Sequence, residues 1–286
     1  MEENYTEPKG FGEIISETFR LIIKHFKDFF FILLILIGPI FLIQVIAELV
    51  SGTDFLRESD AGISLLDVFN PNYEQGTELR NTGSNLLDVF SNLSQLILLS
   101  VAQVAFYHAV NHIRKNEEFT AGSVIKQAFS KFWPILGSAI LFLIIGIGIS
   151  IVPIIFVVLI SIFASAFGQI AGVATPIVLA ILIGLSVALL LIRWSFYLGI
   201  IAFEGNGTGF SESWHLTKGF TWKIFGLLLI LSIITALPSL VLDFLAIYLL
   251  GGSALYGILT NLFSLFTALV FSVGYAVIFF DLKLRS

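Results

Sequence analysis

The chain has 286 residues, of which 57% are hydrophobic and 12% charged, and its mean hydropathy is +0.97. Soluble domains carry about 25% charged residues, so this composition excludes an ordinary soluble domain and makes the lipid bilayer the expected solvent. The net charge of -5 says little about a nucleic-acid partner, and because the basic residues are scattered, no nucleic-acid site is expected. Because the chain has no cysteine, disulfides, thiolate nucleophiles and cysteine-ligated metals are excluded as well.

The first 50 residues predict an interfacial helix that leads into a membrane span. Residues 10–27 alternate at helical spacing between an apolar and a charged face, which is typical of a helix lying in the membrane interface. The apolar face consists of Phe11, Ile15, Phe19, Ile22 and Phe26, and the charged face of Glu13, Glu17, Arg20, Lys24 and Lys27. Residues 28–50 are nearly all apolar and long enough for one span. Gly38-Pro39 should kink that span.

Residues 51–85 form the only long polar connection in the sequence. An apolar patch lies within it, made of Ile63, Leu65, Leu66, Val68 and Phe69. This patch could rest on the membrane surface, but a plain solvated loop is the favoured interpretation.

The middle of the sequence repeats the opening pattern. Residues 86–112 predict a second span, whose polar residues should face other helices rather than lipid. Thr120 is expected to cap a second amphipathic helix that extends to about residue 132. Residues 133–167 carry no charge and predict one tilted or bent span, since a helix of this length exceeds a bilayer of about 30 Å.

The segment 193–225 joins the fourth span, 176–204, to the fifth, 221–250. A turn at 168–175 is expected before the fourth span, and a sixth span is expected at 254–280. Within the joining segment, Glu204 closes the fourth span and Gly207 belongs to the glycine-containing break that follows. Thr208 is expected to cap a third, short helix that contains Trp214 and ends at Gly219. We interpret Glu204, Gly207, Trp214 and Gly219 as a hinge at the membrane edge.

These elements predict an all-α polytopic membrane protein with six transmembrane helices and three interfacial amphipathic helices. Phe106-Tyr107 and Phe196-Tyr197 stand at matching distances before the next interfacial helix, and Trp133 with Gly137 matches Trp222 with Gly226. The sequence therefore predicts one membrane domain, 1–286, built from three pseudo-repeats at about 10–112, 119–204 and 208–282.

The basic residues predict the orientation. Twelve lysines and arginines fall on the side of the termini and the amphipathic helices, whereas only Arg57 and Arg80 fall on the other side. Because basic residues accumulate on the cytoplasmic side of membrane proteins, we expect an inner-membrane protein with both termini in the cytoplasm.

Three stretches carry a resemblance to a known family: FGEIISETFRLIIKHF, RWSFYLGIIAFEGNGTGFSESWHLTKGFTWKIFGLLL and YAVIFFDLKLRS. Together they resemble the membrane domain fused to some bacterial glycerophosphodiester phosphodiesterases, and related stand-alone bacterial membrane proteins. The family pattern maps onto Arg193, Glu204, Gly207, Ser213, Trp214, Leu216, Thr217 and Gly219. Leu198 stands near where the family usually has a proline, and the phosphodiesterase barrel is missing. The resemblance thus implies a six-helix membrane module without an inherited catalytic residue.

Arg193 is the sharpest candidate site residue. If the fourth span is one helix, Arg193 lies 11 residues before its end, about 16 Å into the membrane. No acid lies at matching depth, so we expect its partners among Gln103, Ser232, Ser272 and the carbonyls freed by the Gly38-Pro39 kink. It is either an internal structural clamp, which is favoured, or a site for an anionic ligand such as a lipid phosphate.

Two further candidates have more ordinary interpretations. His108 and His112 have a zinc-compatible spacing, and Glu117 or Glu118 could supply a third ligand, but interfacial histidines with local hydrogen bonds are favoured. Asp243 could be a coupling carboxylate of a transporter, but a solvated residue near a helix end is favoured.

The functional expectation is a non-enzymatic, multi-pass membrane module that binds lipid or a partner membrane protein, as a scaffold or accessory subunit. The alternative is a transporter of lipid or another small molecule with a site near Arg193. Neither a cofactor nor a bound metal is expected. The expected lipid-binding residues, with anionic headgroups as the favoured ligand, are Arg193, Gln103, Lys126, Lys131, Lys218 and Lys223.

Overall fold

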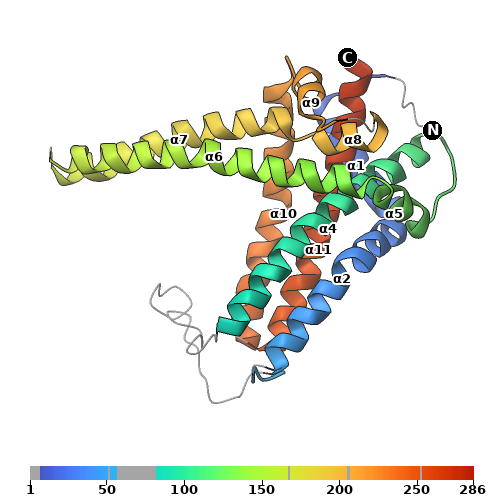
Figure 1. Ribbon diagram of the computed structural model, residues 1–286, viewed down its shortest axis with the longest axis horizontal. Coiled ribbons are helices and arrows are strands. Elements are labelled where there is room, and N and C mark those ends of the chain that lie inside the picture. The colour runs from blue at the N-terminus through green and yellow to red at the C-terminus, as the bar shows by residue number, and fades with distance from the viewer. Residues whose placement is uncertain (1–6, 51, 57–81, 167, 205–206, 252) are drawn as a thin grey trace. The chain divides into compact units, whose positions relative to one another are not determined.

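The computed structural model describes residues 7–50, 52–56, 82–166, 168–204, 207–251 and 253–286, with all of their side chains except those of 82–89 and 169–171. Every regular element in these residues is a helix, so the fold is all-α, as predicted (Figure 1). The apolar patch expected from Ile63 to Phe69 lies outside the described residues.

Ten helices are described. They are α1 (Phe11–Lys24), α2 (Phe26–Val50), α4 (Thr82–Arg114), α5 (Ala121–Phe129), α6 (Phe132–Ser165), α7 (Gln169–Trp194), α8 (Tyr197–Glu204), α9 (Phe210–Leu216), α10 (Thr221–Leu250) and α11 (Ala254–Arg285). A short helix precedes two long ones three times, where α7 and α8 together count as one long element. The pseudo-repeats themselves stay a prediction.

Six described segments are long and apolar enough to cross a membrane: 26–50, 90–114, 132–165, 172–204, 221–250 and 254–285. This confirms the prediction of a six-span, all-α membrane protein. Residues 132–165 form one helix rather than two, as expected. The predicted turn at 168–175 is wrong, because Gly168, with a φ of 111°, ends the turn and α7 begins at Gln169.

The described chain divides into two compact units. Both α10 and α11 contribute residues to each unit. We call residues 9–130 and 229–277 the N-terminal unit. In it, α2 and α4 lie side by side with α5 at one end (Figure 1), and the buried rings of Phe29 and Phe106 meet at 5.3 Å. Thr120 caps α5 as predicted, because its hydroxyl accepts a hydrogen bond from the Ser123 N–H.

The charged face predicted for α1 is wrong at one position. Glu17 is buried together with Ile14, Thr18 and Leu21, and it pairs with the Lys9 ammonium. A buried carboxylate needs such a partner, and Lys9 supplies it from outside the helix. The face of α1 that packs on the protein therefore includes an acid that helical spacing alone assigns to the polar side.

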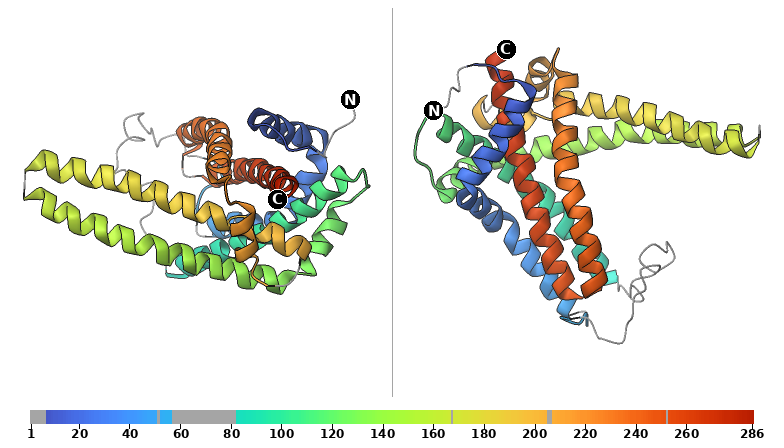
Figure 2. Two further views of the ribbon diagram at one scale, coloured as in Figure 1. Left: turned by 90° about the horizontal axis from the view of Figure 1, so that it is seen from above. Right: turned by 180° about the vertical axis from the view of Figure 1, so that it is seen from behind.

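We call residues 131–228 and 278–286, which make up nearly all of the second unit, the hairpin unit. Its longest elements, α6 and α7, run antiparallel and side by side, as Figures 1 and 2 show from three directions. At the base of this hairpin, α8 packs against α6, and α9 packs against both α7 and α8. The stacked rings of Phe142 and Tyr197, 5.2 Å apart, join α6 to α8. The hairpin unit contains most of the candidate site residues.

Candidate functional site

A helix break lies at the centre of the candidate site. The fourth span was predicted as one helix, but α7 ends at Trp194 and α8 begins at Tyr197. A helix end leaves backbone groups that need other hydrogen-bond partners. The Ser213 hydroxyl serves both sides of the break: it donates to the Arg193 carbonyl at 2.9 Å and accepts from the Phe196 N–H at 3.2 Å. The fourth span, 172–204, is therefore not one continuous helix as predicted.

Thr217 provides a second hydroxyl to the same carbonyl. Its Oγ1 lies 3.3 Å from the Arg193 oxygen and 2.9 Å from the Ser213 carbonyl oxygen. Ser213 and Thr217 are four residues apart, so both hydroxyls project from the same face at the end of α9, and both side chains are fully buried. Ser213 and Thr217 thus act as caps for the broken helix.

The turn into α9 allows this close approach. Gly209 precedes α9 with a φ of 71°, and a Cβ at this position would lie 2.7 Å from the Tyr197 carbonyl oxygen. Only glycine fits such a position without strain. The expectation that Thr208 caps α9 is wrong, because Gly209 occupies the cap position and no side chain bonds there.

The Arg193 side chain lies between α7, α9 and α10. Its guanidinium stands 4.4 Å from the centre of the Trp214 ring, an arrangement that attracts the cation to the ring's π electrons. Its Nε donates to Thr221 Oγ1 at 3.4 Å, a long hydrogen bond. Trp194, whose ring centre is 5.7 Å from that of Trp214, completes the aromatic surroundings.

One expectation about Arg193 is corrected. Its partners are Trp214 and Thr221 instead of Gln103, Ser232 or Ser272; the Gln103 amide donates to the Ser272 carbonyl within the N-terminal unit. Arg193 is the next-to-last residue of α7, within the candidate span 172–204, and it bonds Thr221, the first residue of the candidate span 221–250.

The terminal nitrogens of Arg193, Nη1 and Nη2, have no hydrogen-bond or ion-pair partner among the residues that the structure describes. The side chain is half-buried rather than enclosed. A guanidinium has five N–H donors in a planar fork, and here only the Nε–H is used. Its outer edge is therefore available to an anion.

The other hinge residues have structural roles. Glu204, the last residue of α8, accepts from the Lys283 ammonium at 3.3 Å. Gly207 and Gly219 have φ values of 103° and 87°, which side chains other than glycine rarely adopt. Gly219 thus permits the turn between α9 and α10, as a residue that follows a helix end often does.

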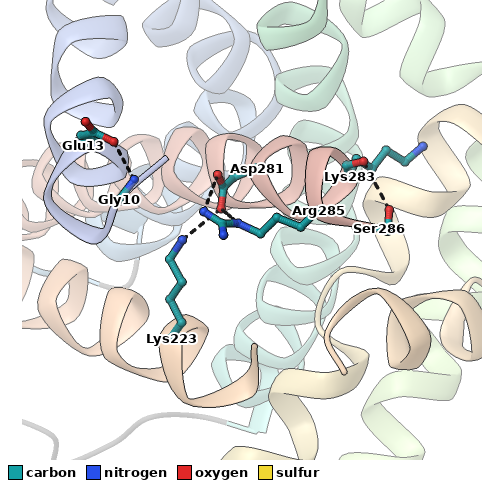
Figure 3. A network of polar contacts seen from close by, with 7 residues as sticks. All are labelled: Gly10, Glu13, Lys223, Asp281, Lys283, Arg285 and Ser286. Carbon is teal, nitrogen blue, oxygen red and sulfur yellow. Dashed lines mark hydrogen bonds and ion pairs between the residues drawn. The ribbon is translucent and has the colours of Figure 1, made fainter. Parts of the chain in front are cut away.

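The four candidate lysines fall into two classes. Lys131 donates to the Ile201 and Ala202 carbonyls, both at 2.9 Å, and so satisfies the end of α8. Figure 3 shows Lys223 and Arg285 converging on the buried Asp281 carboxylate, at 3.2 Å and 2.8 Å. Lys126 and Lys218, in contrast, are exposed. Only this second pair presents its charge to the surroundings, a distinction that the sequence does not show.

The two weaker candidates have local partners. His112 Nδ1 lies 2.7 Å from the Glu117 carboxylate, and its Nε2 lies 3.4 Å from the Gln127 amide nitrogen. Within the described parts of the chain, no three histidine or acidic residues are grouped so that they could hold a metal ion. Asp243 accepts from the Tyr256 hydroxyl at 2.9 Å, which joins α10 to α11 within the N-terminal unit.

The fold and this site define the class: an all-α, multi-pass membrane protein with an arginine beside a helix break in the fourth span, bonded to the first residue of the fifth. Comparison with protein-family models, curated proteins and solved structures finds no match to this chain.

Proposed function

We propose that the protein is a non-enzymatic membrane module that binds the phosphate of an anionic phospholipid at Arg193. In this proposal it acts as a scaffold or accessory subunit for a partner membrane protein. It resides in the cytoplasmic membrane of a bacterium, with both termini in the cytoplasm. The resemblance to the membrane domain of glycerophosphodiester phosphodiesterases agrees with this proposal but stays a prediction.

One observation carries the proposal: Arg193 keeps two Nη groups without a protein partner in the described chain, next to Thr221, where the fifth candidate span begins. Arginine stays charged in proteins, so this group needs an anion or water. The phosphates of a bilayer lie at the ends of the spans, and a planar guanidinium binds phosphate through two parallel hydrogen bonds. Stacking on Trp214 and the bond to Thr221 would hold the guanidinium ready for such a ligand.

The surrounding charge supports an anionic lipid. Lys218 is exposed and precedes Thr221, the first residue of α10, by three positions. The twelve basic residues assigned to the side of the termini favour the cytoplasmic leaflet. Anionic lipids give that surface a negative potential that attracts such residues. A phosphate at Arg193 would thus meet a second cation on the same side.

The hydroxyls next to Arg193 support binding rather than catalysis. A serine nucleophile needs a general base within hydrogen-bond reach. Ser213 and Thr217 instead donate to the backbone carbonyl of Arg193. In the described structure both hydroxyls serve as helix caps, so we assign no catalytic role to this site.

Native mass spectrometry of the purified protein tests the proposal. Wild-type protein should retain anionic phospholipid, Arg193→Gln should lose it, and Arg193→Lys, which keeps the charge but not the fork, should retain less than the wild type. Lys115→Gln, at an exposed lysine in the turn after α4, is the matched control and should retain wild-type occupancy. Equal lipid occupancy in all four proteins would refute binding at Arg193. If liposomes containing the wild-type protein took up a solute saturably, and Arg193→Gln abolished that uptake, the transporter hypothesis would replace the scaffold hypothesis.

A further inference from the structure

The four tryptophans of the protein lie in two contrasting environments, all within the hairpin unit. Trp194 and Trp214 pack against each other near the guanidinium of Arg193. Trp133 and Trp222 instead are 77% and 66% exposed, values that are high for the largest side chain in proteins. The exposed rings of Trp133 and Trp222 therefore need a contact outside the protein.

The exposed pair occupies equivalent positions in two spans. Trp133 is the second residue of α6 and Trp222 the second residue of α10. A phenylalanine packs edge-on against each indole: Phe132 at 5.6 Å from Trp133 and Phe225 at 5.9 Å from Trp222. The two sites thus share both their place in the helix and their local packing.

Each side chain has a large apolar ring and one donor, the indole N–H. Neither indole N–H donates to a protein acceptor among the residues described here. In water the ring would stay exposed, and in the acyl-chain region the N–H would lose every hydrogen-bond partner, which is unfavourable. Only the boundary between the two offers a hydrocarbon contact for the ring and an acceptor for the N–H.

We infer that Trp133 and Trp222 anchor α6 and α10 at the boundary between headgroups and acyl chains, with the phospholipid carbonyl and phosphate oxygens accepting from the indole N–H. The neighbouring lysines do not share this role, because Lys131 and Lys223 bond protein groups. The anchors therefore set the depth at which these two spans begin. This inference requires a membrane protein but not the lipid site at Arg193.

Depth-dependent fluorescence quenching tests the inference. Two variants keep a single tryptophan: Trp133 remains in W194F/W214F/W222F, and Trp222 remains in W133F/W194F/W214F. Each is reconstituted into vesicles of phosphatidylcholine brominated either high on the acyl chain, next to the glycerol, or near the chain end. For both proteins the high bromine should quench fluorescence more strongly, and aqueous iodide should quench less than it quenches free tryptophan.

Stronger quenching by the deep bromine would overturn the inference. Strong quenching by iodide, with no loss of fluorescence in either brominated lipid, would also overturn it.

Circular dichroism checks that the variants are folded. If either variant is not folded, the wild-type protein labelled with 5-fluorotryptophan gives the same comparison. Its four fluorine signals are assigned from single Trp→Phe variants. The signals of Trp133 and Trp222 should broaden more with a lipid spin-labelled at the headgroup than with a lipid spin-labelled at the end of the acyl chain. The reverse order would again refute the assignment.

Discussion

Replacing Ser213 tests the helix break most sharply, because its hydroxyl holds both sides of the break. Ser213→Ala removes the hydrogen bond to the Arg193 carbonyl and the one from the Phe196 N–H. The carbonyl keeps Thr217 as a donor, and both Ser213 and Phe196 are fully buried. A buried hydrogen bond contributes about 0.5–1.5 kcal/mol, and measured side-chain hydrogen bonds in membrane proteins average about 0.6 kcal/mol. We therefore expect Ser213→Ala to lower the free energy of unfolding by about 1–2 kcal/mol.

Equilibrium unfolding in mixed micelles, followed by circular dichroism, measures this loss. Thr217→Val should cost less than Ser213→Ala, because the Arg193 carbonyl keeps the Ser213 hydroxyl. The double variant should lose more than the sum of the two, since that carbonyl then has neither donor. The matched control is Ser211→Ala, an exposed serine in the same short helix, which should change stability by less than about 0.5 kcal/mol. If Ser213→Ala were no less stable than this control, the capping role would be refuted.

Three other predictions follow from the described contacts. Gly199→Ala should destabilise the protein by about 1–3 kcal/mol, because the new Cβ would lie 2.7 Å from a phenylalanine ring, whereas Gly184→Ala, with open space around it, should be neutral or stabilising in the same unfolding assay. Lys131→Gln should lower the free energy of unfolding and leave lipid occupancy unchanged, whereas Lys218→Gln should lower lipid occupancy and leave stability unchanged; the opposite pattern would contradict the division of the lysines. A single cysteine at Ser211 should resist an impermeant thiol reagent on intact cells and react after permeabilisation; labelling from outside would reverse the proposed orientation.

Hydropathy and local caps were sufficient to predict the spans and several helix ends. The fifth span was predicted at 221–250, the bounds that α10 has, because polar residues and Gly219 precede it and a glycine pair follows it. The cap at Thr120 was likewise predictable, since it depends on residues within one turn. Such signals are local in sequence, so no tertiary information is needed to read them.

The helix break and the paired charges could not be read in the same way. Residues 193–204 are compatible with a continuous apolar helix, and the break is stabilised by a hydroxyl that lies 17 residues beyond Phe196. Glu17 and Lys131 look like surface charges in the sequence, yet each is engaged by a group on another segment. Spacing along one helix does not reveal such partners, so the neighbours of Arg193 were predicted wrongly.

The most direct test of the proposed function is an experimental density map of the protein in nanodiscs that contain anionic phospholipid. We expect a phosphate within hydrogen-bond distance of Nη1 and Nη2 of Arg193, with the guanidinium still stacked on Trp214. The same map of Arg193→Gln should lack this phosphate. A wild-type map in which a protein carboxylate or carbonyl occupies both Nη groups and no phosphate is near would contradict the account.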